Sequence, residues 1–246
     1  MARTKHRHRD TPQVRHGSVP PDRPGGLGNF RDALRVGAGF SLGEVDTRAT
    51  PSYDGGKREG RQDLATAEAE LSDLLERLYA ESTAGSRRSV LLVVQGMDTS
   101  GKGGVMRHVV AVNPEGIKAT AFKAPTEEEL AHDFLWRVRK ALPTAGQLGV
   151  FDRSHYEDVL VVRVHDLVPE EEWSTRYDKI NTFERELVDL GTVVVKVMLH
   201  VSNKEQKARL MERLERPDKY YKYNPGDVDE RKCWEEYMEA YQEALT

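Results

Sequence analysis

Short apolar runs alternate along the chain with segments of helical periodicity. Four runs have the length and apolar content of buried strands, at residues 89–95, 118–122, 148–152 and 192–201. The segments between them carry apolar residues three or four positions apart, which is the spacing of amphipathic helices. Such alternation is typical of βαβ units that build a parallel sheet. We therefore predict a three-layer α/β fold whose strands end at one shared ligand-binding edge.

Local signals mark several helices. An amphipathic helix precedes the first strand, and its apolar stripe is expected to be a packing surface. This stripe comprises Leu64, Ala67, Leu71, Leu74, Leu75 and Leu78. Helix starts are also predicted wherever a capping residue is followed three positions later by Glu. These pairs are Thr126 with Glu129, Ser202 with Glu205, and Asp227 with Glu230.

The N-terminal segment differs in composition from the rest of the chain. Residues 1–28 are rich in Pro, Gly, Arg and His and lack apolar periodicity, which predicts a disordered basic tail. Residues 29–246 are expected to form a single domain. The tail holds six Lys or Arg and two Asp, so with a net charge of −4 the remainder carries about −8. A body this acidic argues against nucleic acid as a partner, and a polyanion would have to bind through local basic patches.

The sequence also predicts where in the cell the protein is located. No run of about 18 apolar residues is present to span a bilayer, so no membrane partner is expected. The basic N-terminus is followed by Pro, His and Arg instead of the apolar core of a signal peptide, which predicts a cytoplasmic protein. Cys233 is the single cysteine, which excludes an internal disulfide and a cysteine-rich zinc site.

A phosphate-binding loop is predicted between the first strand and the helix that follows it. Residues 96–102, with the sequence GMDTSGK, have the spacing and the position of a P-loop. Gly96 and Gly101 let backbone N–H groups turn toward phosphate oxygens, and Lys102 adds a full positive charge. Gly103 stands where a P-loop usually supplies a Ser or Thr hydroxyl to Mg²⁺. The metal therefore needs other oxygen ligands.

Two aspartates are the predicted Mg²⁺ ligands. Asp98 lies inside the loop, an unusual place for a negative charge unless a cation separates it from the phosphates. Asp152 ends the strand 148–152, where a Walker-B carboxylate would lie. Mg²⁺ prefers one or two carboxylates together with phosphate oxygens and water. The next residue, Arg153, is expected to stabilise charge on a transferred phosphoryl group, whereas His155 receives no role.

A basic segment is predicted to form a lid over the loop. Residues 204–226 begin as a helix, which ends at Pro217 and passes into a loop with Pro225 and Gly226. Arg209 and Arg213 lie four apart and project from one helical face. Phosphate-binding candidates beyond that face are Lys219, Lys222 and, after the second strand, Lys123. So many cations favour a donor more highly charged than one nucleotide, although a solvated basic helix face is the ordinary alternative.

Seven stretches resemble the polyphosphate kinase 2 family, and the resemblance runs from about residue 40 to residue 245. They are QGMDTSGK at 95–102, NPEG at 113–116, FKAP at 122–125, DFLWR at 133–137, DRSHYEDVL at 152–160, RYDKIN at 176–181 and RLERPDK at 213–219. The resemblance implies a thymidylate-kinase-like P-loop fold with a lid. It also implies Mg²⁺-dependent transfer of phosphate between inorganic polyphosphate and nucleoside mono- or diphosphates.

The resemblance assigns the loop and strand-end aspartates, the loop lysine and the lid arginines to Asp98, Asp152, Lys102, Arg209 and Arg213. Members that phosphorylate AMP as well as ADP commonly have Asn at the position of Asp152, so the acceptor stays open. Family members also continue past the last helix, and we expect full activity or assembly to depend on such a segment.

We therefore predict a reversible polyphosphate:nucleotide phosphotransferase, with AMP or ADP as acceptor. Asp133, Arg137 and Glu157 are candidates for shaping the acceptor site. A dimer or tetramer is expected by analogy with the family. Two alternatives are an ATP-dependent nucleoside-monophosphate kinase and a polyphosphate-binding subunit without catalysis.

Overall fold

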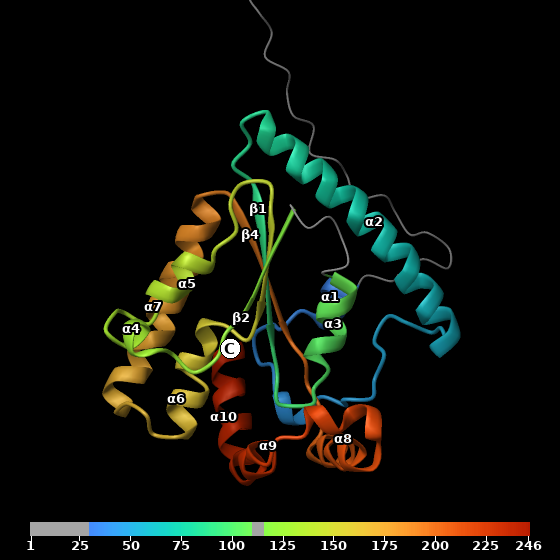
Figure 1. Cartoon of the computed structure of the whole chain (residues 1–246), viewed down its shortest axis with the longest axis vertical. Coiled ribbons are helices and arrows are strands. Elements are labelled where there is room, and N and C mark those ends of the chain that lie inside the picture. Colours follow the sequence, from blue (N-terminus) through green and yellow to red (C-terminus); the bar gives the residue numbers. More distant parts are fainter. Residues whose placement is uncertain (1–29, 110–115) are drawn as a thin grey trace, which may run out of the picture.

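The computed structural model describes residues 30–109 and 116–246 (Figure 1). The predicted tail at 1–28 lies outside the described residues. The described strands form one parallel sheet in the order β2-β3-β1-β4. They are β1 (Ser89–Gln95), β2 (Ile117–Ala121), β3 (Leu148–Asp152) and β4 (Thr192–Met198). The predicted parallel sheet is confirmed, and β1, which carries the P-loop, lies inside it.

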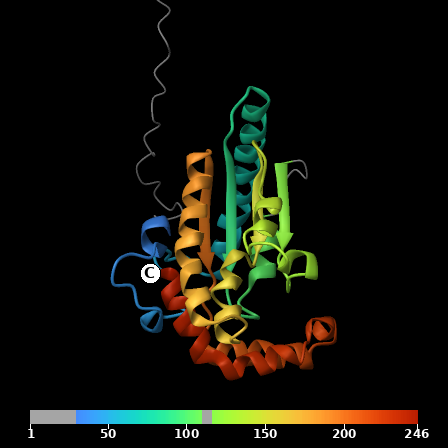
Figure 2. The same ribbon diagram turned by 90° about the vertical axis from the view of Figure 1, so that its left-hand side faces the viewer.

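Helices cover both faces of the sheet, so the three-layer prediction is also confirmed (Figures 1 and 2). On one face, α2 (Lys57–Thr83), through Leu75, and α3 (Lys102–Val109) pack against Leu148 and Val150 of β3. The main core lies on the other face, beneath α5 (Trp136–Ala141), α7 (Glu170–Asp189) and α10 (Trp234–Leu245).

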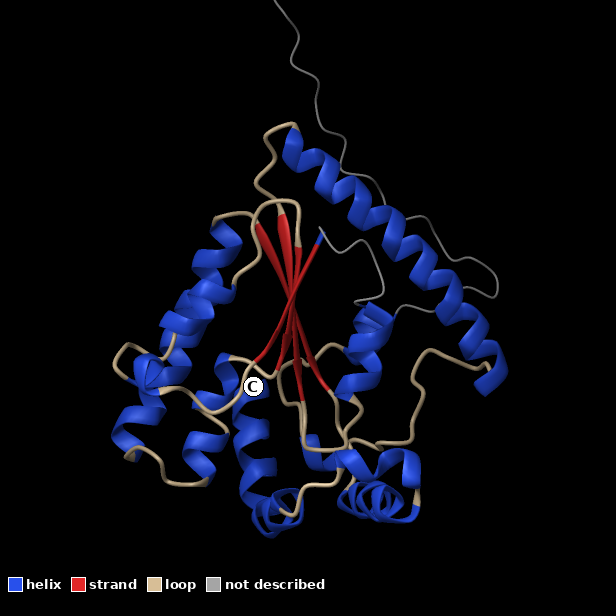
Figure 3. Ribbon diagram, in the orientation of Figure 1, coloured by secondary structure: helices blue, strands red, loops and turns tan. Residues whose placement is uncertain are grey.

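Most of the shorter helices lie in the lower half of the view, toward the carboxyl ends of the strands (Figure 3). The described α-helices among them are α1 (Phe30–Leu34), α4 (Glu127–Leu130), α6 (Val161–Val164), α8 (Asn203–Glu215) and α9 (Gly226–Asp229). The 3-10 helices within the described ranges are η1 (Leu42–Glu44), η3 (His155–Asp158), η4 (Pro217–Lys222) and η5 (Glu230–Cys233). α8 and α9 lie at the carboxyl ends of the strands, where the sequence predicts the ligand-binding edge (Figure 3).

Two predicted strand boundaries differ from the structure. β2 occupies 117–121 instead of 118–122, and β4 ends at Met198 instead of residue 201. Leu199 still donates its backbone N–H to the carbonyl of Gln95 at 2.8 Å, but β1 provides no partner beyond that residue. The apolar run continues because Val201 is buried in the core, so hydropathy did not mark where the strand ends.

The predicted packing stripe and helix caps are only partly correct. Leu75 is buried, but Leu64 and Leu74 are 40% and 52% exposed, so the stripe packs along only part of its length. The Thr126 capping box is present, and the Ser202 hydroxyl accepts the N–H of Glu205. The Asp227 cap is wrong: Asp227 lies inside α9, and its carboxylate pairs with an arginine instead.

No described helix combines the length and the apolar character needed to cross a membrane.

Candidate phosphate-binding site

The P-loop joins β1 to α3 through a tightly constrained backbone. Gly96 has φ +152°, and a Cβ there would come within 2.7 Å of the carbonyl oxygen of Leu199. Only glycine fits such a position without displacing its neighbours. Thr99 adopts φ +64°, which is strained for a β-branched residue and is characteristic of functional loops. The P-loop therefore keeps a strained backbone conformation of the kind that is common at functional sites.

Lys102 folds back over this loop. Its Nζ donates to the carbonyls of Gly96 and Met97 at 2.6 and 3.2 Å. Burial lowers the pKa of Lys102, and the nearby charge of Asp98 offsets only part of that effect. Bound phosphate oxygens would give this ammonium a stronger partner than two neutral carbonyls.

Asp98, Asp152 and Arg153 meet where β1 and β3, which are neighbours, come to their ends. Arg153 donates from Nη2 to Oδ1 of Asp98 at 3.1 Å. Asp152 pairs in register with Val94 of β1, and its Oδ1 is buried with no hydrogen-bond partner among the described residues. An unpaired buried carboxylate oxygen is costly, and a cation would stabilise it. The donor set of two carboxylates next to a phosphate loop therefore fits Mg²⁺.

Arg153 is held in an unusual way. It has φ +62°, and its backbone N–H donates to the carbonyl of Val94 at 3.1 Å. Burial acts to lower the pKa of this guanidinium, but Glu157 and Asp98 outweigh burial and raise it overall. Arg153 is therefore a permanent cation placed against the aspartate of the P-loop.

The lid segment is docked on the P-loop. Arg209 donates to the carbonyl of Thr99 at 2.8 Å, and buried Gln206 donates to the carbonyl of Asp98 at 3.1 Å. Arg213 reaches the carbonyl of Lys222 at 2.8 Å and the carboxylate of Asp227 at 2.6 Å. Side chains of α8 thus contact both the loop and the following η4 segment.

Together these elements enclose a cavity of about 730 Å³. Its lining contains eight Lys or Arg side chains against three carboxylates, and this excess of positive charge suits a polyanion. The cations are Lys102, Arg107, Lys123, Arg153, Arg209, Arg213, Lys219 and Lys222, and the carboxylates are Asp98, Asp152 and Glu212. Gly101 and Gly103 also line it, whereas Gly96 lines a smaller adjacent cavity.

Arg107 was not identified from the sequence. It lies on α3, and its Nε donates to the carbonyl of Gly103 at 3.1 Å. The available signal was its position four residues after Gly103 in the same predicted helix, because residues three or four apart lie on one helical face.

The three acceptor candidates are not brought together. Glu157 lines a smaller adjacent cavity of about 260 Å³, which shares Asp98 and Arg153 with the large one. Burial raises the pKa of Glu157, although Arg153 opposes the shift. Arg137 lines neither cavity and donates to the backbone carbonyl of Lys123 at 2.8 Å. Asp133 also lies outside both, where its carboxylate accepts the N–H of Leu135 at 3.0 Å.

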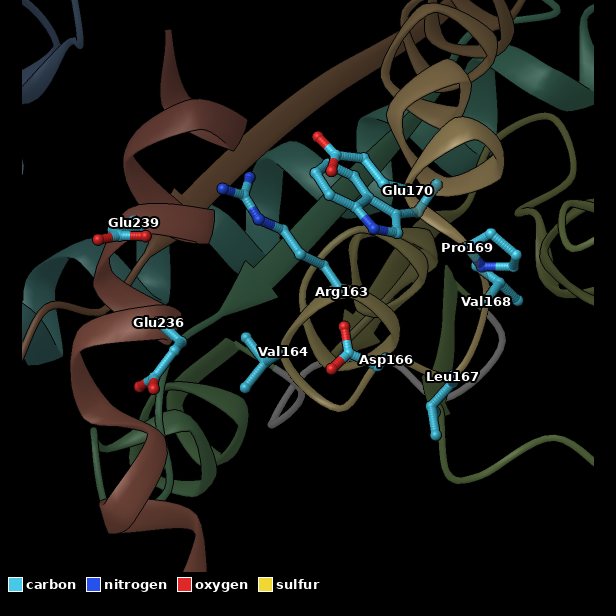
Figure 4. A pocket seen from close by; sticks show the side chains of 10 residues that line it. Arg163, Val164, Asp166, Leu167, Val168, Pro169, Glu170, Glu236 and Glu239 are labelled. Carbon is cyan, nitrogen blue, oxygen red and sulfur yellow. The ribbon is translucent and has the colours of Figure 1, made fainter.

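A second large pocket, of about 610 Å³, has the opposite charge (Figure 4). Among the described residues it is lined by the carboxylates Asp166, Glu170, Glu236 and Glu239. Its cation, Arg163, already pairs with Glu243 and donates to the hydroxyl of Tyr177. This pocket would repel a phosphate chain, so the cavity at the P-loop is the candidate site.

The chain is similar to known proteins over most of its length. A family model described as polyphosphate kinase 2 matches residues 55–246. The AMP/ADP-polyphosphate phosphotransferase of Meiothermus ruber is 46% identical over 207 residues, covering 84% of this chain and 76% of the relative. The ADP-polyphosphate phosphotransferase of Rhodopseudomonas palustris is 42% identical, covering 87% and 77%. A crystal structure of polyphosphate kinase 2 from Arthrobacter aurescens TC1 aligns with a TM-score of 0.86 at 52% identity, covering 87% of this chain and 76% of that one.

Proposed function

Since the chain belongs to the polyphosphate kinase 2 family, we propose that it transfers a phosphoryl group between inorganic polyphosphate and a nucleoside mono- or diphosphate. One observation carries the proposal: among the described residues, eight cationic side chains line a P-loop cavity whose lining also includes Asp98 of the loop and Asp152 at the end of β3. A single nucleotide needs fewer cations than this, whereas a phosphate chain carries a charge on every unit.

We assign the metal role to Asp98 and Asp152. Held by these two carboxylates, Mg²⁺ would supply positive charge that offsets the negative charge developing during transfer. No group of three or more potential metal-binding side chains occurs among residues 30–109 and 116–246. Two carboxylates are still sufficient, because substrate phosphates and water complete a magnesium site.

The chain's own cations position the phosphates. Phosphoryl transfer needs little covalent participation from protein, so placement and charge neutralisation supply most of the rate. Lys102 and Arg153 line the cavity, and Arg209 and Arg213 line it from α8. With the lid docked on the loop, these residues also limit access of water, which would otherwise intercept the phosphoryl group.

The smaller cavity is the proposed acceptor site. It shares Asp98 and Arg153 with the large cavity, so an acceptor phosphate there would adjoin the end of a donor chain. Glu157, which lines it, is the acceptor candidate that this geometry favours. Asp133 and Arg137 would then act indirectly, Arg137 by holding the backbone at Lys123.

The test is a Mg²⁺-dependent assay with polyphosphate as sole donor and AMP, ADP, GMP or GDP as acceptor. Formation of ADP from AMP or of ATP from ADP supports the proposal and identifies the acceptor. Activity with ATP alone as donor would support the nucleoside-monophosphate kinase alternative. Tight binding of polyphosphate without turnover of any nucleotide would support the binding-subunit alternative.

Site variants test the assignment of the aspartates. Asp98→Asn and Asp152→Ala are expected to lower kcat by two or more orders of magnitude while the thermal unfolding midpoint stays within a few degrees. Asp166→Asn, in the acidic pocket, is the matched control and should keep full activity. Near-normal turnover in either site variant would remove the paired-aspartate assignment.

The proposal also includes a cytoplasmic location, as predicted from the sequence, and, by analogy with the family, a homo-oligomer that is a dimer or tetramer. Light scattering on the purified protein tests the assembly.

A further inference from the structure

α7 carries two charged residues at core positions. Its buried stripe includes Arg176 and Glu184, which are only 8% and 9% exposed. Charged side chains are rarely buried unless they are paired with an opposite charge or hydrogen-bonded. Both of these contact the segment 153–158, which begins with Arg153 at the phosphate-binding site. Both buried charges of α7 therefore help to hold that segment, although Arg176 also pairs with Glu172 and Glu184 with Lys196.

Glu184 is the centre of a four-residue polar network. Its Oε1 accepts the hydroxyl of Tyr156 at 3.0 Å and lies 3.2 Å from Nε2 of His155. Lys196 of β4 donates to Oε2 of Glu184 at 2.7 Å and to the Tyr156 hydroxyl at 2.8 Å. His155 is fully buried and packs edge-on against Phe183. The network therefore holds two consecutive residues of the segment.

Arg176 fixes the far end of the same segment. It donates to Oδ1 and to the backbone carbonyl of Asp158, at 2.9 and 3.3 Å. Arg153, at the near end, is held in a left-handed conformation with φ +62°. A non-glycine residue keeps such a backbone only when its surroundings over-determine it. Ser154, the next residue, is fully buried, and its hydroxyl accepts the N–H of Tyr156 at 3.2 Å, so the anchors on His155 and Tyr156 extend to the residue beside Arg153.

We propose that Glu184 is a positioning residue for phosphoryl transfer: through His155 and Tyr156 it fixes the backbone of the segment, so that the Arg153 guanidinium faces Asp98 and the substrate phosphates. This rests on the proposed function of the P-loop cavity. Glu184 touches no substrate; it acts through the geometry of Arg153.

The charge of Glu184 supports this role. Burial alone would raise the pKa of its carboxyl, but His155 and Lys196 outweigh burial and lower it. An ionised buried carboxylate is costly, and a well-packed apolar residue often gives equal or greater stability. A buried charge that restrains one segment of the site is better explained by placement than by stability.

The experiment is a double-mutant cycle on kcat with Glu184→Gln and Arg153→Ala. Glu184→Gln keeps the side-chain shape and removes the charge. In the full-length protein we expect it to lower kcat roughly 10- to 100-fold, because a shift near 1 Å at the site is sufficient for that loss. In the Arg153→Ala background the same change should lower kcat less than about 3-fold. Equal losses in both backgrounds would overturn the proposal, since a general structural role does not depend on Arg153.

Controls separate the possible outcomes. Glu186 lies on the same helix, is exposed and pairs with Arg139 at 3.0 Å. The control variant Glu186→Gln should leave kcat unchanged. If Glu184→Gln fails to fold, Tyr156→Phe removes the two hydrogen bonds that this hydroxyl makes with Glu184 and Lys196 and enters the same cycle. Failure of the wild type to use polyphosphate would count against the proposed function alone. In that case the same four proteins are compared by their Kd for polyphosphate, measured by calorimetry. Equal losses of affinity caused by Glu184→Gln in both backgrounds would again overturn the positioning role.

Discussion

The glycines of the P-loop provide a graded test of its backbone geometry. Gly96→Ala combines an unfavourable φ with a contact of 2.7 Å to the Leu199 carbonyl oxygen. That oxygen cannot retreat freely, because the N–H of Leu199 is bonded to Gln95 of β1. Gly101 has φ +112° but open space where a Cβ would lie, and Gly103 has open space and no positive φ. The three positions thus separate backbone strain from steric clash.

The expected magnitudes follow from this geometry. Strain at an unfavourable φ costs about 1–3 kcal/mol, and a clash in a packed environment adds about 1–3 kcal/mol. Gly96→Ala should therefore destabilise by roughly 2–6 kcal/mol and Gly101→Ala by roughly 1–3 kcal/mol. Gly103 lies in α3, where alanine is favoured over glycine, so Gly103→Ala should stabilise the folded protein by about 0.5–1 kcal/mol.

Thermal unfolding of the three variants measures these differences directly. For a protein of this size about 1 kcal/mol shifts Tm by roughly 2–4 °C, so Gly96→Ala should melt roughly 5–20 °C below the wild type. Its kcat should fall as well, because the loop that holds the phosphates is displaced. If Gly96→Ala and Gly101→Ala melted together, the contact with Leu199 would not constrain the loop and the steric part of the argument would be refuted.

Two further predictions concern charge. Burial raises the pKa of Asp158 from 3.8 to about 6, so the folded protein keeps a proton that the unfolded chain releases, and the stability from this carboxyl is lost as pH rises from about 4 to about 6. Relative to Asp158→Asn the wild type should lose roughly 3 kcal/mol across that window in urea unfolding, and parallel pH profiles would contradict this. Arg213→Ala should raise the KM for polyphosphate about 10-fold or more with a reduced salt dependence, whereas Arg216→Ala, which removes a surface cation outside the cavity, should change it less than about 2-fold. Equal shifts in the two arginine variants would mean that net charge alone governs binding.

Much of the fold was predictable because parallel strands buried on both faces are apolar at nearly every position. β1 and β3 were placed to the residue for this reason. The end of β4 was not, because strand length depends on where the neighbouring strand stops. The sequence continues with Leu199 and Val201, which are apolar but serve other contacts. The failed cap at Asp227 has a similar origin: a distant arginine takes its carboxylate.

The site was partly predictable for a different reason. A P-loop and a strand-end carboxylate are local signals, and the topology of a parallel sheet brings them to one edge. Gln206 bonding to the backbone of Asp98 joins residues 108 apart, and no local pattern announces it. Arg153 in a left-handed conformation and the charge of Glu184 in the core are also tertiary features. Sequence patterns thus indicate which groups take part, while long-range contacts determine how each group is aimed.

These contacts also divide the lid into two parts. The first turns of α8 are tied to the P-loop, since Gln206 is 1% exposed and bonds to the loop backbone, as does Arg209. Among the described residues, η4 makes no such hydrogen bond to the P-loop. It is joined to α8 by the hydrogen bond from Arg213 to the carbonyl of Lys222 and by the ion pair of Lys219 with Glu212. Admission of a phosphate chain is therefore easier by displacement of η4 than of α8. The cations that meet the chain first are then Lys219 and Lys222, while the residues nearest the reacting phosphate keep their places.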